Sequence, residues 1–318
     1  MNVLLLLALA ACGGPPAAAP RTLTLAAYTT PRELYGQAVL PAFTAWWRER
    51  AGEEVHVEAS YQGSGAQARA VVGGLEADVV ALSLDPDVQA IADAGLIDAD
   101  WRDDPTGGMV SRSIVVLAVR PGNPKGIRDW SDLARPDVEV LTPDVRTSGG
   151  AMWNVAALWG AARRAGADPE ARLASVLARV RVMDKGARES MLTFEKGVGD
   201  VAITYENEVI VSRAAGQAID YVVPPSTLRI DNPIAVVDRY AAQHGNVELA
   251  EAFVTFARSP DAQRELGRFG LRPVAGPSEL PAPADLFTIA DLGGWASLRA
   301  DVFGDGGPYE RALRAARP

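Results

Sequence analysis

The sequence predicts an α/β protein built on parallel strands, and two observations predict it. Short apolar segments of strand character alternate with segments of helical spacing from residue 22 to about residue 237. This alternation is typical of parallel sheets flanked by helices. The turns that lead from strand to helix are repeatedly rich in Gly, Ser and Thr. At 318 residues, 48% of them hydrophobic, the chain is long enough for two domains with separate cores.

The first third of the chain repeats the order strand, turn, helix. Residues 22–27 alternate apolar and polar side chains, as a strand does. Thr30-Pro31-Arg32-Glu33 reads as a capping box with proline at the first helical position, so a helix is expected from there to about residue 50. Beyond it we expect strands at 55–59, 79–82 and 113–119 and helices at 66–74 and 86–94.

The rest of the chain continues this pattern before it becomes mostly helical. A helix is expected at 151–165, directly after the turn 147–150, because Trp153, Ala156 and Gly160 recur at helical spacing. We further expect strands at 138–142, 182–183, 201–205, 219–223 and 234–237, helices at 173–180 and 187–195, and mostly helical structure from residue 247 onward.

The N-terminus has the pattern of a lipoprotein signal. An apolar run from Leu4 leads to Leu9-Ala10-Ala11-Cys12, where small residues before cysteine form a cleavage site with a lipid-accepting thiol. The run is too short to span a bilayer, which takes about 20 residues. We therefore expect a signal peptide at 1–11, lipidation of Cys12 and a flexible Gly/Pro/Ala tether over 12–21. The protein would be exported and lipid-anchored, in the periplasm or on the outer face of the membrane.

Charge and cysteine content exclude several function classes. The chain has 31 Lys and Arg against 40 Asp and Glu, a net charge of −9, and no block rich in Lys or Arg. This argues against nucleic acid and anionic membrane surfaces as partners, because both require a positive field. One cysteine excludes a disulfide framework, and His56 and His244 lie far apart in the chain. We expect no metal site, no cofactor and no Cys/His nucleophile.

Four strand-to-helix turns carry small or polar residues where the helix begins, and they indicate an anion site. They lie at 29–30, 63–65, 148–150 and 186–187. The first N–H groups of a helix lack intrahelical partners, and the helix dipole adds about half a positive charge there. In open α/β sheets, ligands bind off the carboxyl ends of strands, where these turns lie. Several such turns can surround one anion, although glycine-rich turns also arise for steric reasons alone.

Nine short segments carry a family resemblance, in a fixed order between about residues 23 and 315. They are 31–35, 63–65, 74–80, 122–125, 147–150, 186–188, 206–208, 235–238 and 286–289. In these segments the chain resembles the periplasmic sulfate-binding proteins that feed ABC transporters. The resemblance implies a type II periplasmic-binding-protein fold, in which two α/β lobes with parallel-rich sheets close on a ligand in the cleft between them. It places the first lobe at 22–111, the second at 112–232, and a return to the first lobe, with the C-terminal helices, at 233–318.

The resemblance also implies which groups hold the ligand. Sulfate is held in the family by backbone N–H groups that match Thr29, Ser64, Gly149, Gly150 and Ala187, with the hydroxyl of Ser148 as a further donor. These residues fall on the four turns described above. Sulfate is fully ionised at neutral pH and only accepts hydrogen bonds. A set of donors without a carboxylate therefore suits sulfate and rejects protonated phosphate.

The chain departs from the family pattern at one donor. The family has a tryptophan just before Glu-Asn-Glu, whose indole N–H donates to sulfate, and Tyr205 stands there in this chain. A phenol both donates and accepts hydrogen bonds and differs in length, which leaves a related oxyanion open. Thr29 and Ala66 stand where the family has aspartate and lysine, and Lys185 and Glu189 replace small residues beside Ala187.

The charged residues near these turns are expected to act indirectly. Arg188 is interpreted as bound to neighbouring carbonyl and carboxylate groups rather than to the anion. Glu206 and Glu208 are expected on a strand, where residues two apart share a face, and in structural salt bridges, because nothing nearby supplies a nucleophile or metal. Trp46-Trp47 is expected to pack within its helix layer rather than to form a stacking platform.

The sequence thus predicts a monomeric receptor that binds sulfate and delivers it to an ABC permease, without catalysis. A receptor for thiosulfate, molybdate, tungstate or phosphate on the same scaffold stays open. An enzyme on this fold would need a titratable residue in the cleft. A lipoprotein that docks a signalling partner is a third alternative, which the sequence does not separate from a transport receptor.

Overall fold

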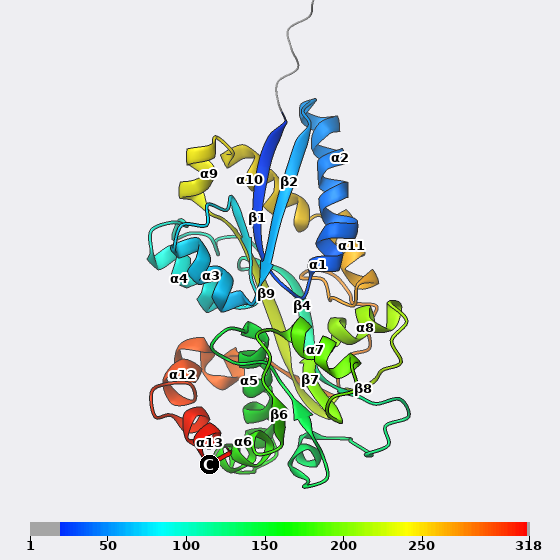
Figure 1. The fold of residues 1–318 in the computed structure, drawn as a ribbon. Helices are drawn as coiled ribbons and strands as arrows, with labels where there is room; N and C mark the ends of the chain where they lie inside the picture. Colours follow the sequence, from blue (N-terminus) through cyan, green and yellow to red (C-terminus); the bar gives the residue numbers. More distant parts are fainter. Residues whose placement is uncertain (1–19, 317–318) are drawn as a thin grey trace, which may run out of the picture.

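The computed structural model describes residues 20–316, which form two α/β lobes stacked along one long axis (Figure 1). The expected signal peptide 1–11 and the lipidation site Cys12 lie outside the described residues, as does most of the expected tether 12–21. Regular structure begins with strand β1 (Arg21–Tyr28), at the end of that tether. None of the helices within 20–316 combines the length and hydrophobicity that a membrane crossing requires.

The first lobe is a sheet covered by helices on both faces. Its strands are β1, β2 (Val55–Gln62) and β3 (Val79–Ala81), which run parallel in the order β2-β1-β3. Its helices are α1 (Arg32–Leu34), η1 (Tyr35–Val39), α2 (Leu40–Ala51), α3 (Ser64–Val72), α4 (Asp85–Asp93), α9 (Asp238–His244), α10 (Val247–Ala257) and α11 (Pro260–Arg268). Residues of β1 contribute to a hydrophobic core on each face of the sheet. Leu23 and Leu25 pack with α2 and α10, and Ala26 packs on the opposite face with α3 and α4.

The second lobe has the same layered construction. Its strands are β5 (Val140–Leu141), β6 (Val180–Val182), β7 (Val201–Tyr205), β8 (Asp220–Val222) and β10 (Asp285–Phe287). Its helices are η2 (Trp130–Ala134), α5 (Gly149–Arg164), α6 (Pro169–Leu177), α7 (Ala187–Glu195), α8 (Glu206–Ala214), η3 (Ala290–Leu292), α12 (Gly294–Asp301) and α13 (Pro308–Ala316). The β7 residues Val201 and Ile203 face the core beneath α5 and α6, and Ala202 faces the core beneath α7 and α8.

Two long strands run through both lobes and join them. β4 (Met109–Val119) pairs with β9 (Ser226–Val236) through its first half and with β7 and β8 through its second half. β9 pairs with β3 of the first lobe at one end and with β10 of the second at the other. The whole sheet has the order β2-β1-β3-β9-β4-β7-β5-β6. Because β4 and β9 run antiparallel to their neighbours on the main path, the sheet is mixed rather than parallel throughout.

The C-terminal residues differ from their expected place. We expected 233–318 to return to the first lobe, but only the part up to α11 does so. β10 pairs with the second-lobe end of β9, and α13 packs mainly on α6. Leu298 and Val302 of this segment share a core with Trp153 of α5, and burial of these apolar side chains holds the segment on the second lobe.

Two local expectations were wrong, and one α-helix was missed. Glu206 and Glu208 lie in helix α8, not on a strand, because the polar residues after Tyr205 begin a helix directly at the end of β7. Helix α9 was not expected. Thr30 forms no capping box: Pro31 is the N-cap of α1, without a side-chain hydrogen bond, and Thr30 is buried.

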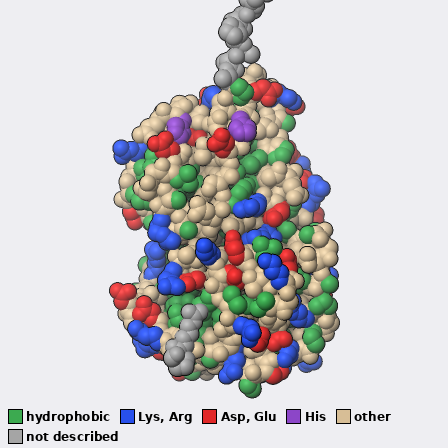
Figure 2. Space-filling model, viewed as in Figure 1, with side chains coloured by type: hydrophobic (Ala, Val, Ile, Leu, Met, Phe, Trp, Pro, Cys, Tyr) green, Lys and Arg blue, Asp and Glu red, His purple; other side chains and the backbone are tan. Residues whose placement is uncertain are grey.

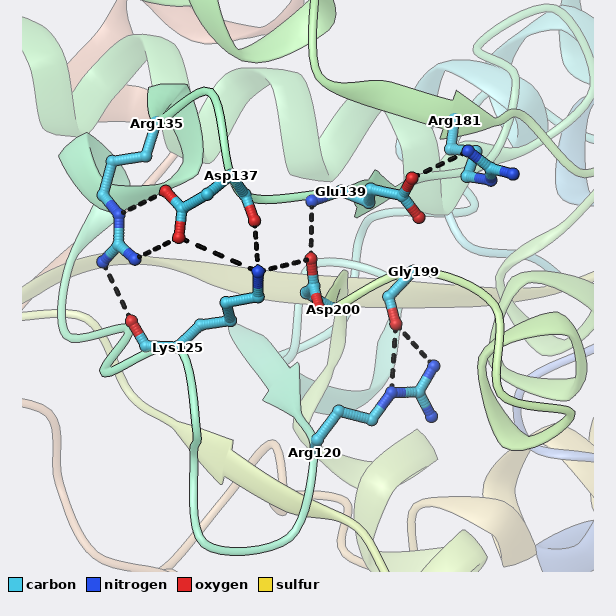
Figure 3. Close-up of polar contacts among 8 residues, drawn as sticks. All are labelled: Arg120, Lys125, Arg135, Asp137, Glu139, Arg181, Gly199 and Asp200. Carbon is cyan, nitrogen blue, oxygen red and sulfur yellow. Dashed lines mark hydrogen bonds and ion pairs between the residues drawn. The ribbon is translucent and has the colours of Figure 1, made fainter.

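Polar contacts tie together the turns at the far end of the second lobe (Figure 3). Arg120, which follows β4, donates hydrogen bonds to the carbonyl oxygens of Phe194, Val198 and Gly199. Its guanidinium also lies 3.7 Å from the centre of the Phe194 ring. Lys125 Nζ lies 2.5 Å from the carbonyl oxygen of Asp137. These bonds give the carbonyl oxygens of the turns a side-chain donor.

Candidate functional site

A small cavity lies where the two lobes meet, and all seven residues predicted to bind the anion line it. The lining consists of Tyr28, Thr29, Thr30, Gly63, Ser64, Ser83, Ser148, Gly149, Gly150, Ala187 and Tyr205. The cavity has a volume of about 10 Å³. This is room for one small polar group and far less than the 300–1,000 Å³, roughly, of a site for a drug-sized molecule. None of these eleven lining residues carries a charged side chain.

Three helix N-termini and the end of one strand meet at this cavity. Ser64, Gly149 and Ala187 are the first residues of α3, α5 and α7. Thr29 follows the last residue of β1. The first N–H groups of each helix have no intrahelical acceptor, and each helix end carries a partial positive charge. The arrangement concentrates unpaired N–H donors around a small volume, which favours an anion.

Ser148 is the N-cap of α5, and this role leaves its hydrogen free. Its side-chain oxygen accepts a hydrogen bond from the N–H of Ala151 at 3.4 Å. A hydroxyl that accepts in this way still has its own hydrogen to donate. Ser148 can therefore cap the helix and donate to a ligand at once.

The hydroxyl of Ser64 is fully used within the first lobe. It donates to Asp87 Oδ2 at 2.5 Å and accepts from the N–H of Ser83 at 3.0 Å. Burial raises the pKa of the Asp87 carboxyl, and the hydrogen bond from Ser64 partly opposes this. The hydroxyl hydrogen of Ser64 is thus already used, which leaves the backbone N–H as the donor that this residue has for a ligand.

The glycines of the site are required by close approach, across the lobes at Gly63 and Gly149 and within the second lobe at Gly150. A Cβ atom on Gly149 would lie 2.5 Å from Ser83 Oγ, and one on Gly150 would lie 2.9 Å from Tyr205 Cε2. On the opposite side, a Cβ on Gly63 would lie 2.3 Å from the carbonyl oxygen of Thr147. No side chain larger than hydrogen fits at these three positions with the lobes in this arrangement.

Tyr205 reaches across the cavity to the first lobe. Its hydroxyl oxygen lies 2.7 Å from Ser83 Oγ. Trp153 Nε1 donates to the backbone oxygen of Ser83 at 3.0 Å and to its Oγ at 3.1 Å. Burial raises the pKa of the Tyr205 phenol, so Tyr205 is neutral at physiological pH.

Arg188 does not line the cavity and bridges the lobes beside it. Its guanidinium lies 2.6 Å from Glu33 Oε2 in the first lobe and 3.2 Å from Glu208 Oε2 in the second. It also donates to the carbonyl oxygen of Thr30 at 3.4 Å. This position matches the expected indirect role. Burial raises the pKa of Glu208 to about 7, although the charge of Arg188 opposes the shift.

Glu206 and Glu208 point to different partners. Glu206 forms a buried ion pair with Arg272 at 2.8 Å, whereas Glu208 faces Arg188. Two residues apart on a helix are about 200° apart around its axis, so the two carboxylates do not converge on one bond. Both lie outside the cavity lining, in the structural ion pairs that the sequence indicated.

The sequence reasoning missed Tyr28 and Ser83 as lining residues, whereas Thr30 and Gly63 lie in the turns that it indicated. Ser83 follows β3 by two residues, and a polar residue at the carboxyl end of a strand in an α/β sheet is a signal that would have found it. Its contact with Tyr205 joins residues 122 positions apart, which no local pattern shows.

Comparisons with known proteins agree with this geometry. A family model described as bacterial extracellular solute-binding protein matches residues 23–272. A sulfate-binding protein of Synechococcus elongatus is 42% identical, over 96% of this chain and 92% of its own. A thiosulfate-binding protein of Escherichia coli is 34% identical, over 91% of this chain and 90% of its own.

A solved structure extends the agreement to the fold. The sulfate-binding protein SubI from Mycobacterium tuberculosis superposes with a TM-score of 0.81 at 40% identity, covering 88% of this chain and 98% of that one. The expected two-lobed α/β fold class is confirmed by this likeness. The chain belongs to the bacterial extracellular solute-binding proteins, and its resemblance within them is to the sulfate-binding proteins.

Proposed function

We propose that this protein binds sulfate between its lobes outside the cytoplasmic membrane and delivers it to an ABC permease. The observation that carries the proposal is the uncharged cavity at which three helix N-termini meet. The similarity to proteins named for sulfate binding supports the same ligand. Binding and closure are the whole of the proposed chemistry, and no catalytic step is assigned.

The donor set suits a fully ionised anion. We propose backbone N–H donors at Thr29, Ser64, Gly149, Gly150 and Ala187, a hydroxyl donor at Ser148 and a phenol donor at Tyr205. No carboxylate lines the cavity to accept a hydrogen from a protonated ligand. Sulfate satisfies every donor, whereas hydrogen phosphate brings a hydrogen that competes with them.

Closure of the lobes is the proposed signal to the permease. Direct contacts cross between the lobes around the cavity, including Arg188 to Glu33 at 2.6 Å and Arg69 to the carbonyl oxygen of Arg146 at 3.3 Å. A ligand that touches both lobes stabilises the closed form by its differential affinity for that form. The permease then recognises the closed form of the protein rather than the anion itself.

Export and anchoring complete the proposal. We propose that Cys12 carries a lipid that holds the monomeric receptor at the outer face of the membrane, as the signal pattern at residues 1–12 indicates. Acidic and basic side chains are interspersed over the face shown in Figure 2, without one large patch of either sign. The anchor, rather than a charged surface, would keep the protein at the membrane.

Thiosulfate is the second candidate ligand. The favouring observation is 34% identity to a thiosulfate-binding protein. The greater identity to sulfate-binding proteins places sulfate first.

Calorimetry on the purified mature protein tests the function. Sulfate is expected to bind with a stoichiometry of one, ahead of thiosulfate, molybdate and phosphate measured side by side. A hundredfold excess of sulfate over its dissociation constant should stabilise the fold by about 2.7 kcal/mol, which raises the melting temperature. The absence of both binding heat and a thermal shift with sulfate would refute the proposal. Tighter binding of thiosulfate than of sulfate would make thiosulfate the proposed ligand.

A further inference from the structure

Ser83 belongs to the first lobe but contacts the second lobe at the cavity wall. It is 1% exposed and lines the cavity together with Tyr205. Its Oγ lies 2.7 Å from Tyr205 Oη and accepts from Trp153 Nε1 at 3.1 Å. Both aromatic residues come from the second lobe, in β7 and α5. The side chain of Ser83 is therefore a point at which the two lobes and the cavity meet.

The hydrogens of this pair leave one donor unused. Two hydroxyl groups carry two hydrogens, and the contact between Ser83 and Tyr205 uses one of them. Trp153 supplies its own hydrogen, so it occupies a lone pair of Ser83 Oγ. Within residues 20–316, neither hydroxyl donates to a further protein acceptor. Whichever of the two donates to the other, one hydrogen remains.

The surroundings place this spare hydrogen beside the helix end that attracts the anion. Ser83 Oγ and the Tyr205 ring lie against Gly149 and Gly150, close enough to exclude a Cβ at either position. The N–H groups of that first turn of α5 have no intrahelical acceptor. Since burial raises the pKa of the Tyr205 phenol, its hydrogen stays in place at neutral pH.

We propose that Ser83 and Tyr205 act together as one shared hydrogen-bond donor to the bound anion, which makes Ser83 an anion-contacting residue from the first lobe. This inference rests on the sulfate-binding function proposed above. Each hydroxyl retains a hydrogen when the other is removed, so each substitutes for its partner. Because the bond between them crosses the lobes, the shared donor is complete only in the closed form.

A double-mutant cycle with sulfate tests the shared donor. Ser83→Ala and Tyr205→Phe are each expected to weaken binding about two- to fivefold, and the double variant about a hundredfold. The loss in the double variant should exceed the product of the two single losses, because only there does the anion lose the donor. Ser212→Ala is the matched control: this buried serine donates to Glu195 at 2.6 Å, away from the cavity, and its removal should leave binding unchanged.

Three results would overturn the inference. A double loss equal to the product of the single losses shows that the hydroxyls act independently. A double variant that binds like the wild type shows that neither hydroxyl contacts the anion. A wild type that takes up no sulfate overturns the proposed function as well, and so differs from failure of the shared donor alone. Melting curves without sulfate check folding. If the double variant does not fold, Ser83→Gly/Tyr205→Phe, which also lacks both hydroxyl groups, replaces it with the same expected loss.

Discussion

At the scale of single residues, Gly149 lies where the contact between the lobes and the proposed anion site coincide. A valine there would meet Ser83 Oγ, which a Cβ would approach to 2.5 Å, and would cover the first N–H groups of α5. The clash is with the other lobe, so opening relieves it and each lobe stays folded. Gly149→Val is expected to weaken sulfate binding more than about a hundredfold by calorimetry, with an unchanged circular dichroism spectrum.

The control for this residue is a glycine with open space around it. A Cβ on Gly267 of α11 would meet nothing within 4 Å. Gly267→Val is therefore expected to bind sulfate like the wild type. If Gly149→Val binds sulfate as the wild type does, the anion site does not lie at the start of α5.

At the scale of elements, Arg120 joins the end of β4 to the turn between α7 and β7 (Figure 3). Arg120→Ala leaves the carbonyl oxygens of Phe194, Val198 and Gly199 without this donor, and is expected to lower the free energy of unfolding by about 1.5–3 kcal/mol. Arg181 nearby provides the matched control. Its ion pair with Glu139 is exposed, so Arg181→Ala should cost only about 0.2–1 kcal/mol.

Urea denaturation measures both Arg variants, and sulfate calorimetry completes the comparison. Neither residue lines the cavity, so both variants should retain the affinity of the wild type. Equal destabilisation by the two substitutions would show that the carbonyl contacts of Arg120 contribute nothing beyond a surface ion pair.

At the scale of the whole molecule, the buried carboxyl of Glu208 at the lobe boundary links stability to pH. Burial raises its pKa from 4.5 to about 7, so the folded protein holds a proton there that the unfolded chain releases. The resulting stability is fully present below pH 4.5 and is lost as the pH rises to about 7. Glu208→Gln removes this dependence. As the pH rises from 4.5 to about 7, its free energy of unfolding should increase relative to that of the wild type by about 1–3 kcal/mol.

Urea denaturation at a series of pH values measures the Glu208 effect. Glu54→Gln is the control, since the Glu54 side chain is 66% exposed and lies far from the lobe boundary in sequence and fold. A constant difference between Glu208→Gln and the wild type from pH 4.5 to pH 7 would contradict the expectation.

Much of the cavity lining was predictable because three of its residues lie at helix starts. A turn of small residues before a helix marks a helix start from local sequence alone. Ala187 opens α7 where expected, and α3 and α5 begin at Ser64 and Gly149, two residues before the expected starts at 66 and 151. The alternation of apolar residues in β1 likewise predicted a strand, because Leu23 and Leu25 are buried against helices while Thr22 and Thr24 between them are less buried. Local geometry follows from neighbours in the chain.

The sequence by itself determined most of the strand and helix order and the family. Packing decided the contacts between residues distant in the chain. Residues 285–316 lie on the second lobe because Leu298 and Val302 find an apolar surface beside Trp153 there. Ser83 reaches Tyr205 only because β4 and β9 bring the two lobes together. Apolar groups are buried against, and polar groups hydrogen-bond with, the groups that the fold brings near them. Only the tertiary structure therefore decided which residues contact Leu298, Val302 and Ser83.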